Sequence, residues 1–118
     1  LEHADARGEI YSISFPGGKE LMLLHSKAGA LRGGHSHDVS EVVVVLSGRM
    51  RYHKKVRGNE RTFIVGAGEC SWNAAGEIHM GEFLEDTWLI EYKLAEKGSW
   101  IQTDYEPMRE KVRASAQE

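Results

Sequence analysis

The sequence is poor in cysteine, in proline and in long apolar runs. Cys70 is the single cysteine among 118 residues, so no disulfide can form within the chain and the fold depends on its core. No apolar segment approaches the roughly 20 residues that a membrane-spanning helix needs. Residues 1–7 lack the apolar stretch of a secretory signal. We therefore predict a cytoplasmic protein with no membrane partner, although the sequence starts at Leu1 and leaves open whether a segment precedes it.

The chain also has no excess of positive charge. The chain has 15 basic and 18 acidic residues, which gives a formal net charge of -3. A nucleic-acid-binding domain would carry a basic face or stripe, so we predict no nucleic-acid partner. The length is that of one ordinary domain, and we predict a single domain over residues 1–118.

Short apolar or alternating segments fill most of the chain, and glycine-rich turns separate them. This pattern is typical of a closed all-β architecture rather than of an α/β one. The predicted strands cover residues 8–15, 19–27, 42–46, 49–56, 61–65, 70–72, 79–84 and 88–94. After Gly98 the pattern changes, and Pro107 followed by polar and apolar residues predicts a short C-terminal helix at about 106–116.

Two histidines and a glutamate precede or open the most apolar strand. His35 and His37 are two residues apart, so on a strand their imidazoles project to the same side. Glu41 begins the strand that contains Val42–Val45. Two neutral imidazoles beside a carboxylate suit a divalent first-row metal, and a further ligand should come from elsewhere in the chain.

The same stretch resembles the first sequence motif of the cupin superfamily. Its fixed positions are matched in order by Gly29, His35, His37, Glu41 and Gly48. The segment from Gly68 to Phe83 is similar to the second motif and contains Gly76 and His79, but it has Ala74 where the family has proline and Phe83 where the family has asparagine. Neither departure removes a metal ligand.

This resemblance implies a cupin-type double-stranded β-helix, a jelly-roll barrel spanning about residues 8–96, with the motif residues facing its interior. It implies one divalent transition metal per chain, Fe, Mn, Ni, Cu or Zn, held by His35, His37, Glu41 and His79. Cupins are commonly homodimers, and the strand itself favours a partner. With one parity lining the barrel, Val42 and Val44 need a cover on the other side, which a second subunit would supply.

A largely apolar pocket should surround the metal, as in most small-molecule sites. The predicted wall residues are Val43, Trp72, Phe83, Trp88, Ile90 and Tyr92. Arg32 could clamp a substrate carboxylate, although a loop arginine more often forms a surface ion pair. His25 and Tyr92 are the candidate acid or base groups, and for both a core or surface role is the simpler interpretation.

The leading hypothesis is a metal-binding cupin that acts on a small organic molecule as a dioxygenase or isomerase. One alternative is a non-catalytic module that senses a small ligand or a metal, since the sequence offers no convincing acid or base beside the ligands. Another compares Arg32-Gly-Gly-His35-Ser-His37 with the similar segment of nucleotide-sugar ketoisomerases of the RmlC-like kind, where histidines act as acid and base. Glu41 is better explained as a metal ligand, so this last alternative ranks below the leading hypothesis.

Overall fold

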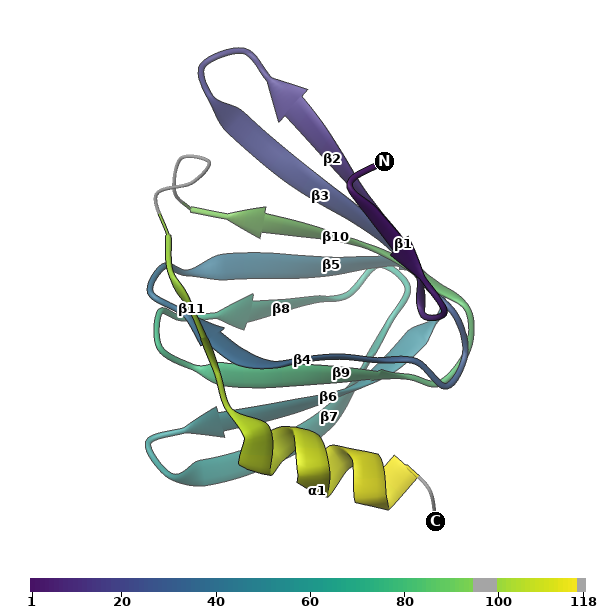
Figure 1. Cartoon of the computed structure of the whole chain (residues 1–118), viewed down its shortest axis with the longest axis vertical. Coiled ribbons are helices and arrows are strands. Elements are labelled where there is room, and N and C mark those ends of the chain that lie inside the picture. Colours follow the sequence, from purple (N-terminus) through teal and green to yellow (C-terminus); the bar gives the residue numbers. More distant parts are fainter. Residues whose placement is uncertain (95–99, 117–118) are drawn as a thin grey trace.

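A computed structural model describes residues 1–94 and 100–116, which form two antiparallel sheets and one helix (Figure 1). One sheet has the strand order β1-β2-β3-β10-β5-β8 and the other has the order β11-β4-β9-β6-β7. The elements are β1 (His3–Asp5), β2 (Gly8–Phe15), β3 (Lys19–Ser26), β4 (Leu31–His37), β5 (Glu41–Ser47), β6 (Arg49–Val56), β7 (Asn59–Gly66), β8 (Cys70–Asn73), β9 (Ile78–Phe83), β10 (Thr87–Lys93), β11 (Gln102–Asp104) and α1 (Glu106–Ala116). The predicted all-β architecture is confirmed.

Turn chemistry explains the hairpins. The β2–β3 hairpin closes at Pro16-Gly17-Gly18, with Phe15 paired to Lys19. The β6–β7 hairpin closes at Arg57 and Gly58, whose φ angles are 50° and 81°. Two successive positive φ angles match the right-handed twist of the flanking strands, so this tight turn keeps β6 and β7 paired over their whole length.

The core lies between the inner faces of the two sheets. The buried apolar residues that form it are Leu24, Val43, Val45, Met50, Tyr52, Val65, Phe83 and Leu89. Val43 and Val45 are buried, whereas Val42 and Val44 on the opposite parity of β5 are only half-buried. One side of this apolar strand therefore faces the barrel interior, as predicted, and the other side faces outward.

Helix α1 packs across β4 and β9 (Figure 1). Met108 and Val112 on the helix are buried against Met80 of β9. The helix has Pro107 in its first turn, where proline is tolerated, and it confirms the predicted C-terminal helix. Three strands are missing from the predicted ranges: β4, where only His35 and His37 were considered as strand residues, and the short strands β1 and β11. β1 pairs with β2 and β11 pairs with the histidine end of β4.

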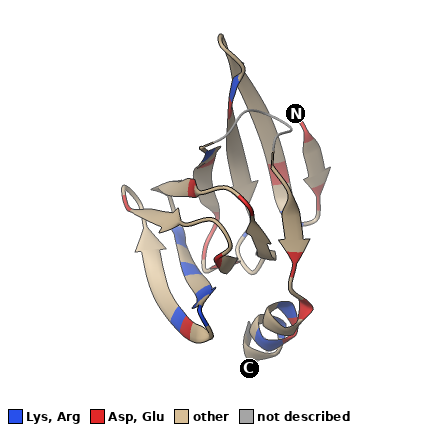
Figure 2. Ribbon diagram, turned by 90° about the vertical axis from the view of Figure 1, so that its left-hand side faces the viewer, with Lys and Arg blue, Asp and Glu red and all other residues tan. Residues whose placement is uncertain are grey.

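The surface carries mixed charge. Basic residues lie on the β6–β7 hairpin and on α1, and acidic residues lie on the same two elements (Figure 2). Among the described residues no helix is long and apolar enough to cross a membrane. The predicted end of the barrel at about residue 96 falls outside the described residues.

Candidate metal centre

Three histidines from two neighbouring strands gather inside the barrel. His35 and His37 come from β4, and the β4–β9 register places His79 opposite His35. The ring centroids are 4.7 Å apart for His35 and His37, 4.9 Å for His35 and His79, and 5.3 Å for His37 and His79. One donor atom from each ring can be chosen so that all three lie within 4.8 Å of one another. This spacing allows the three rings to bind one shared metal ion.

A bulge in β4 makes this approach possible. The β4–β9 register shifts between Gly33 and His35, and Gly33 has a φ of 104°. A Cβ atom at Gly33 would lie 2.8 Å from the carbonyl oxygen of His79. Glycine is therefore required here both for the left-handed backbone and for the close contact with the strand that carries His79.

Glu41 is buried beside the histidines. Its Oε1 atom lies 3.1 Å from Nε2 of His79 and 3.8 Å from Nδ1 of His37. Asn73 donates a hydrogen bond of 3.1 Å from Nδ2 to the same oxygen, and the same amide nitrogen lies 2.7 Å from the Tyr52 hydroxyl. Nζ of Lys93 is 3.5 Å from Oε2. The structure thus brings together all four predicted ligands.

The environment sets the protonation of the cluster. Burial, together with the neighbouring His79 and His37, lowers the pKa of His35 to about 3. Burial also lowers the pKa of His37. Burial alone would raise the pKa of Glu41, but the hydrogen bond and charge of His79 and the charge of Lys93 outweigh it and bring the pKa to about 2. Near neutral pH, His35 and His37 are neutral and Glu41 is ionised, which are the forms that bind metals.

The donor set fits a divalent metal. Within the described part of the chain, Nδ1 of His37 and Oε2 of Glu41 are buried without a hydrogen-bond partner. Buried polar atoms normally have partners, so these two atoms indicate a missing ligand. Imidazole nitrogens and a carboxylate oxygen suit Fe, Mn, Ni, Cu and Zn alike.

Trp100 and Gln102, which lie beyond the predicted strands, and Lys93 complete the surroundings of His37. The Trp100 ring meets the His37 ring edge-on at 5.1 Å. Nζ of Lys93 lies 4.3 Å from the centre of the Trp100 ring. Gln102 Oε1 lies 3.3 Å from Nε2 of His37. These contacts orient His37 at one end of the barrel.

The histidines open onto a cavity of about 220 Å³. Its wall includes the predicted residues Arg32, Val43 and Phe83, together with Arg7, Ile10, Leu24, Met50, Tyr52, Leu89, Glu91, Lys93 and Gln102. Glu91 places a carboxyl group in this cavity. Burial and the nearby Glu41 raise the pKa of Glu91 to about 7, so its carboxyl can exchange a proton near neutral pH.

The structure corrects the predicted side of β10. The residues of β10 that line the cavity are Leu89, Glu91 and Lys93, and not Trp88, Ile90 and Tyr92. The reason is the register with β5, which pairs Leu89 with Val45, Glu91 with Val43 and Lys93 with Glu41. Cross-strand partners share a face, so the partners of the inward-facing β5 residues also point inward.

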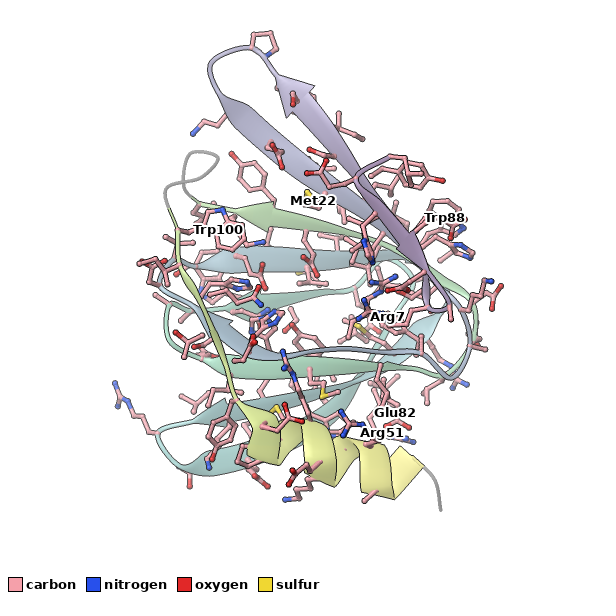
Figure 3. All side chains as sticks on the ribbon, in the orientation of Figure 1. Arg7, Met22, Arg51, Glu82, Trp88 and Trp100 are labelled. Atoms are coloured by element: carbon pink, nitrogen blue, oxygen red, sulfur yellow. The ribbon has the colours of Figure 1, made fainter. Side chains whose placement is uncertain are left out.

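Two other predicted residues lie outside the cavity. Trp72 is 51% exposed and borders a different hollow, with Cys70 and Lys54. His25 stacks on Trp88 with ring centroids 4.7 Å apart, and its Nδ1 lies 2.9 Å from Oε2 of Glu9. Figure 3 shows Trp88 at the side of the barrel, away from the interior. The pocket role predicted for Trp72, Trp88, Ile90, Tyr92 and His25 is therefore wrong for this cavity.

Sequence reasoning missed several residues of the site for identifiable reasons. Asn73 and Lys93 could have been found from the register, because both are cross-strand partners of Glu41. Glu91 lies on the more polar side of its strand. Because an apolar interior was expected, the prediction placed the opposite side, with Trp88, Ile90 and Tyr92, in the pocket. Trp100 and Gln102 follow a segment without strand periodicity, so the sequence held no signal for them.

Comparisons with known proteins find structural relatives only. No family model matches the sequence, and no curated protein matches it either. The capsular polysaccharide assembling protein CapF from Staphylococcus aureus matches with a TM-score of 0.76 and 21% identity, over 89% of this chain and 31% of CapF. The oxalate decarboxylase of Lactobacillus farciminis, solved as a formate complex, matches with a TM-score of 0.75 and 19% identity, over 84% of this chain and 32% of its own.

A third relative is the oxalate decarboxylase of Bacillus subtilis, in a structure concerned with its Mn(II) centres. It matches with a TM-score of 0.72 and 21% identity, over 82% of this chain and 28% of its own. The chain thus spans about a third of the length of these proteins. At this level of identity the similarity concerns the fold.

Proposed function

The chain has the cupin fold, and we propose that it binds one divalent transition metal inside the barrel and acts there on a small organic molecule. The observation that carries the proposal is the convergence of His35, His37 and His79 on one point beside the buried Glu41. Placing three imidazoles and a carboxylate in a buried site is costly unless they share a ligand. The Mn(II) centres of the Bacillus subtilis relative support manganese as one of the metals considered.

A bound ion would supply a Lewis acid for a carbonyl or enol oxygen or, if redox-active, an electron-transfer centre. The protein's own residues prepare the site. Asn73 donates to Oε1 of Glu41 and lies in hydrogen-bonding distance of the Tyr52 hydroxyl, which fixes the carboxylate. Val43, Phe83 and Leu89 line the cavity with apolar surface and limit the entry of water.

Glu91 favours an enzyme over a binding module. Its carboxyl lines the same cavity as the histidines, and its raised pKa of about 7 allows it to hold or release a proton next to a bound molecule. We therefore propose a dioxygenase or isomerase activity in which Glu91 accepts or donates a proton. The ketoisomerase alternative needs histidines that are free to act as acid and base, and the contact of Glu41 with His79 argues against it.

We also propose a homodimer formed through the outer face of β5, β8 and β10. Val42 pairs with Trp72 and Tyr92, and Val44 pairs with Ile90, so apolar side chains from three strands share this face. Trp72 is 51% and Leu46 is 52% exposed. Contiguous exposed apolar surface of this kind is typical of protein interfaces, and a second copy of the chain would cover it.

Cobalt substitution tests the proposed metal function directly. Co(II) added to the wild-type protein should give visible d–d bands at one equivalent, and acetohydroxamate, a bidentate oxygen ligand, should shift them by entering open positions. The His35→Ala variant should give neither signal. Bands that are equally strong in His35→Ala, or bands that acetohydroxamate leaves unchanged, would contradict an open metal site in the barrel. Oxygen uptake with diketones, flavonols and thiols then separates a dioxygenase from an isomerase.

A further inference from the structure

The bulge in β4 leaves two backbone carbonyls that the C-terminal part of the chain satisfies. The β4–β9 register shifts between Gly33 and His35, so Gly34 between them has no partner on β9. The carbonyl oxygen of Gly34 accepts a hydrogen bond of 2.8 Å from the backbone N–H of Tyr105. The carbonyl oxygen of Gly33 accepts one of 2.9 Å from Nε of Arg109, on α1. The backbone directly before the first histidine of the site is therefore fixed from outside the β4–β9 ladder.

Arg109 reaches this bulge from the outer side of the barrel. Helix α1 packs on Met80 of β9 (Figure 1), and His79, the preceding residue on that strand, points to the opposite face and lines the cavity. The Arg109 side chain is 24% exposed and lies so close to Gly34 that a Cβ at that glycine would overlap its Cγ. Burial is the main cause of the low pKa of His35, and the positive charge of Arg109 is a smaller cause. The guanidinium thus acts close to a ligand histidine without lining the cavity itself.

A chain of hydrogen bonds leads from Arg109 to the second histidine. The β4–β11 register pairs Asp104 with His35 and Gln102 with His37. Nη2 of Arg109 donates a hydrogen bond of 3.0 Å to Oδ1 of Asp104, and Nε2 of Gln102 donates one of 3.1 Å to the same oxygen. Oε1 of Gln102 lies 3.3 Å from Nε2 of His37. One guanidinium therefore contacts the bulge before His35 and connects, through two side chains of β11, to His37.

The contact with Gln102 selects the nitrogen of His37 that can bind a metal. A carboxamide oxygen only accepts hydrogen bonds, so Nε2 of His37 carries the hydrogen and Nδ1 keeps its lone pair. Within residues 1–94 and 100–116, this Nδ1 is buried without a hydrogen-bond partner, and it lies 3.8 Å from Oε1 of Glu41. The free donor atom is thus beside another proposed ligand. Partners that fix the tautomer of a ligating histidine contribute to metal affinity although they do not touch the metal.

We propose that Arg109 is a positioning residue of the metal centre. It holds the bulge that precedes His35, and its hydrogen-bond chain through β11 orients His37. This inference rests on the proposed function, because it takes the histidines as metal ligands. It adds that residues of the C-terminal segment 102–109, none of them a ligand, control the metal affinity. Coupling of this kind is reciprocal, so metal binding in turn stabilises the docked position of α1.

Metal affinity in matched variants tests the positioning role. Arg109→Met removes the donors and keeps an unbranched side chain that can pack on the bulge, so the Zn(II) affinity measured by chelator competition should fall about 10- to 100-fold. Arg109→Lys keeps the charge but can reach only one of the two acceptors, and its affinity should lie between those of Arg109→Met and the wild type. Arg113→Met is the control, because Arg113 lies on the same helix, its side chain is 53% exposed, and its ion pair is with Glu106. It should keep the affinity of the wild type.

Two further measurements distinguish this role from one confined to stability. Urea unfolding in the presence of a chelator gives the stability of each metal-free variant, and the Co(II) absorption bands at saturating metal report the geometry of the occupied site. Arg109→Met should shift the cobalt bands as well as lower the affinity, whereas Arg113→Met should do neither. If Arg109→Met lowers only the stability of the metal-free protein and keeps the wild-type affinity and bands, Arg109 merely anchors the helix and the proposal is wrong.

A second variant and a metal-free measurement keep the outcomes separable from a folding defect and from the proposed function. Gln102→Leu replaces an exposed side chain, so it should fold even if Arg109→Met does not, and it should also weaken Zn(II) binding; wild-type affinity in this variant would count against the hydrogen-bond chain.

If the wild-type protein binds no metal, the proposed function is wrong, and nitrogen NMR of the imidazoles in the metal-free protein decides the positioning role by itself. The spectra should show the Nε2–H tautomer of His37 in the wild type and a mixture of tautomers in Gln102→Leu and Arg109→Met. Unchanged imidazole signals in these two variants would overturn the inference.

Discussion

Oε1 of Glu41 lies 3.1 Å from Nε2 of His79, while Nδ1 of the same ring lies 3.2 Å from the carbonyl oxygen of Glu77. If Nδ1 carries the hydrogen and donates it to that carbonyl, Nε2 presents a lone pair to the carboxylate oxygen. Two acceptors at this distance need a proton or a cation between them. A backbone carbonyl that fixes the tautomer of a histidine is a common feature of metal sites. The contact is the most specific indication of where the ion binds.

Asn73 should be important for metal affinity although it is not a ligand. It donates to Oε1 of Glu41 and contacts the hydroxyl of Tyr52. Asn73→Ala should weaken metal binding by about 10- to 100-fold and lower the free energy of unfolding by about 1–3 kcal/mol. Chelator competition and urea denaturation measure the two effects. Ser71→Ala, on the same strand and also buried, is the control, and unchanged metal affinity in Asn73→Ala would refute the orienting role.

Two glycines with similar backbone angles should differ in their tolerance of alanine. Gly29 and Gly33 have φ angles of 87° and 104°, but only at Gly33 would a Cβ meet other atoms, 2.8 Å from the carbonyl oxygen of His79. Gly29→Ala should cost about 1–2 kcal/mol for the backbone strain alone. Gly33→Ala should cost at least about 1–3 kcal/mol more and should weaken metal binding, because β9 must move. Equal losses of stability in denaturant titrations would argue against the close approach.

Glu91 should make the metal-free protein less stable as the pH rises. Its pKa is raised from 4.5 to about 7 in the folded state, so the folded protein binds the proton more tightly than the unfolded chain does. This stabilisation is complete below about pH 4.5 and is lost as the pH passes through 7. Because water reaches the cavity, we expect a loss of about 2 kcal/mol between pH 5 and pH 8, less than the full shift would give.

The Glu91→Gln variant isolates this effect. The groups that face Glu91 are Glu41, Lys93, His79 and Arg32, and they remain in the variant. Guanidinium denaturation in the presence of a chelator, at pH 5, 6.5 and 8, should show that Glu91→Gln gains stability relative to the wild type as the pH increases. Glu110→Gln on the exposed side of α1 should follow the wild type. Parallel curves for the wild type and Glu91→Gln would exclude a proton-binding carboxyl in the cavity.

The outer face of β5 should mediate dimerisation. In sedimentation velocity at about 10 µM, the wild-type protein should migrate with twice the chain mass of 13.2 kDa. Val44→Asp should migrate as a monomer, because a carboxylate would face the partner's apolar surface. Ile64→Asp is the control, since Ile64 is 46% exposed and lies on β7 in the other sheet. A monomeric wild type at this concentration would disprove the dimer.

The sequence predicted most of the strands and the ligand positions because both depend on short-range patterns. Turns at Pro16-Gly17-Gly18 and Arg57-Gly58 mark strand ends locally, and the resemblance to cupin motifs supplied His79 as the partner of His35 and His37. The turns lie where they were predicted. The structure also places the centroids of the three histidine rings within 5.3 Å of one another.

The sequence did not predict the site residues whose position depends on how distant strands pair. Parity alone cannot show which face of β10 turns inward, because both parities contain large side chains, and the register with β5 chooses the face with Glu91. The contact of Trp100 with His37 joins segments far apart in the chain and depends on how β11 pairs with β4. Residues of the site that touch no motif therefore had to come from the structure.

Metal content measured by elemental analysis tests the central claim most directly. After incubation with Mn(II) or Zn(II) and removal of unbound metal, the wild-type protein should retain about one equivalent per chain, and His35→Ala, His79→Ala and Glu41→Ala should each lose most of it. His53→Ala is the control, because His53 contacts Glu82 and Thr62 and does not line the cavity. Negligible metal in the wild type, or equal retention in all variants, would contradict a metal centre built from His35, His37, Glu41 and His79.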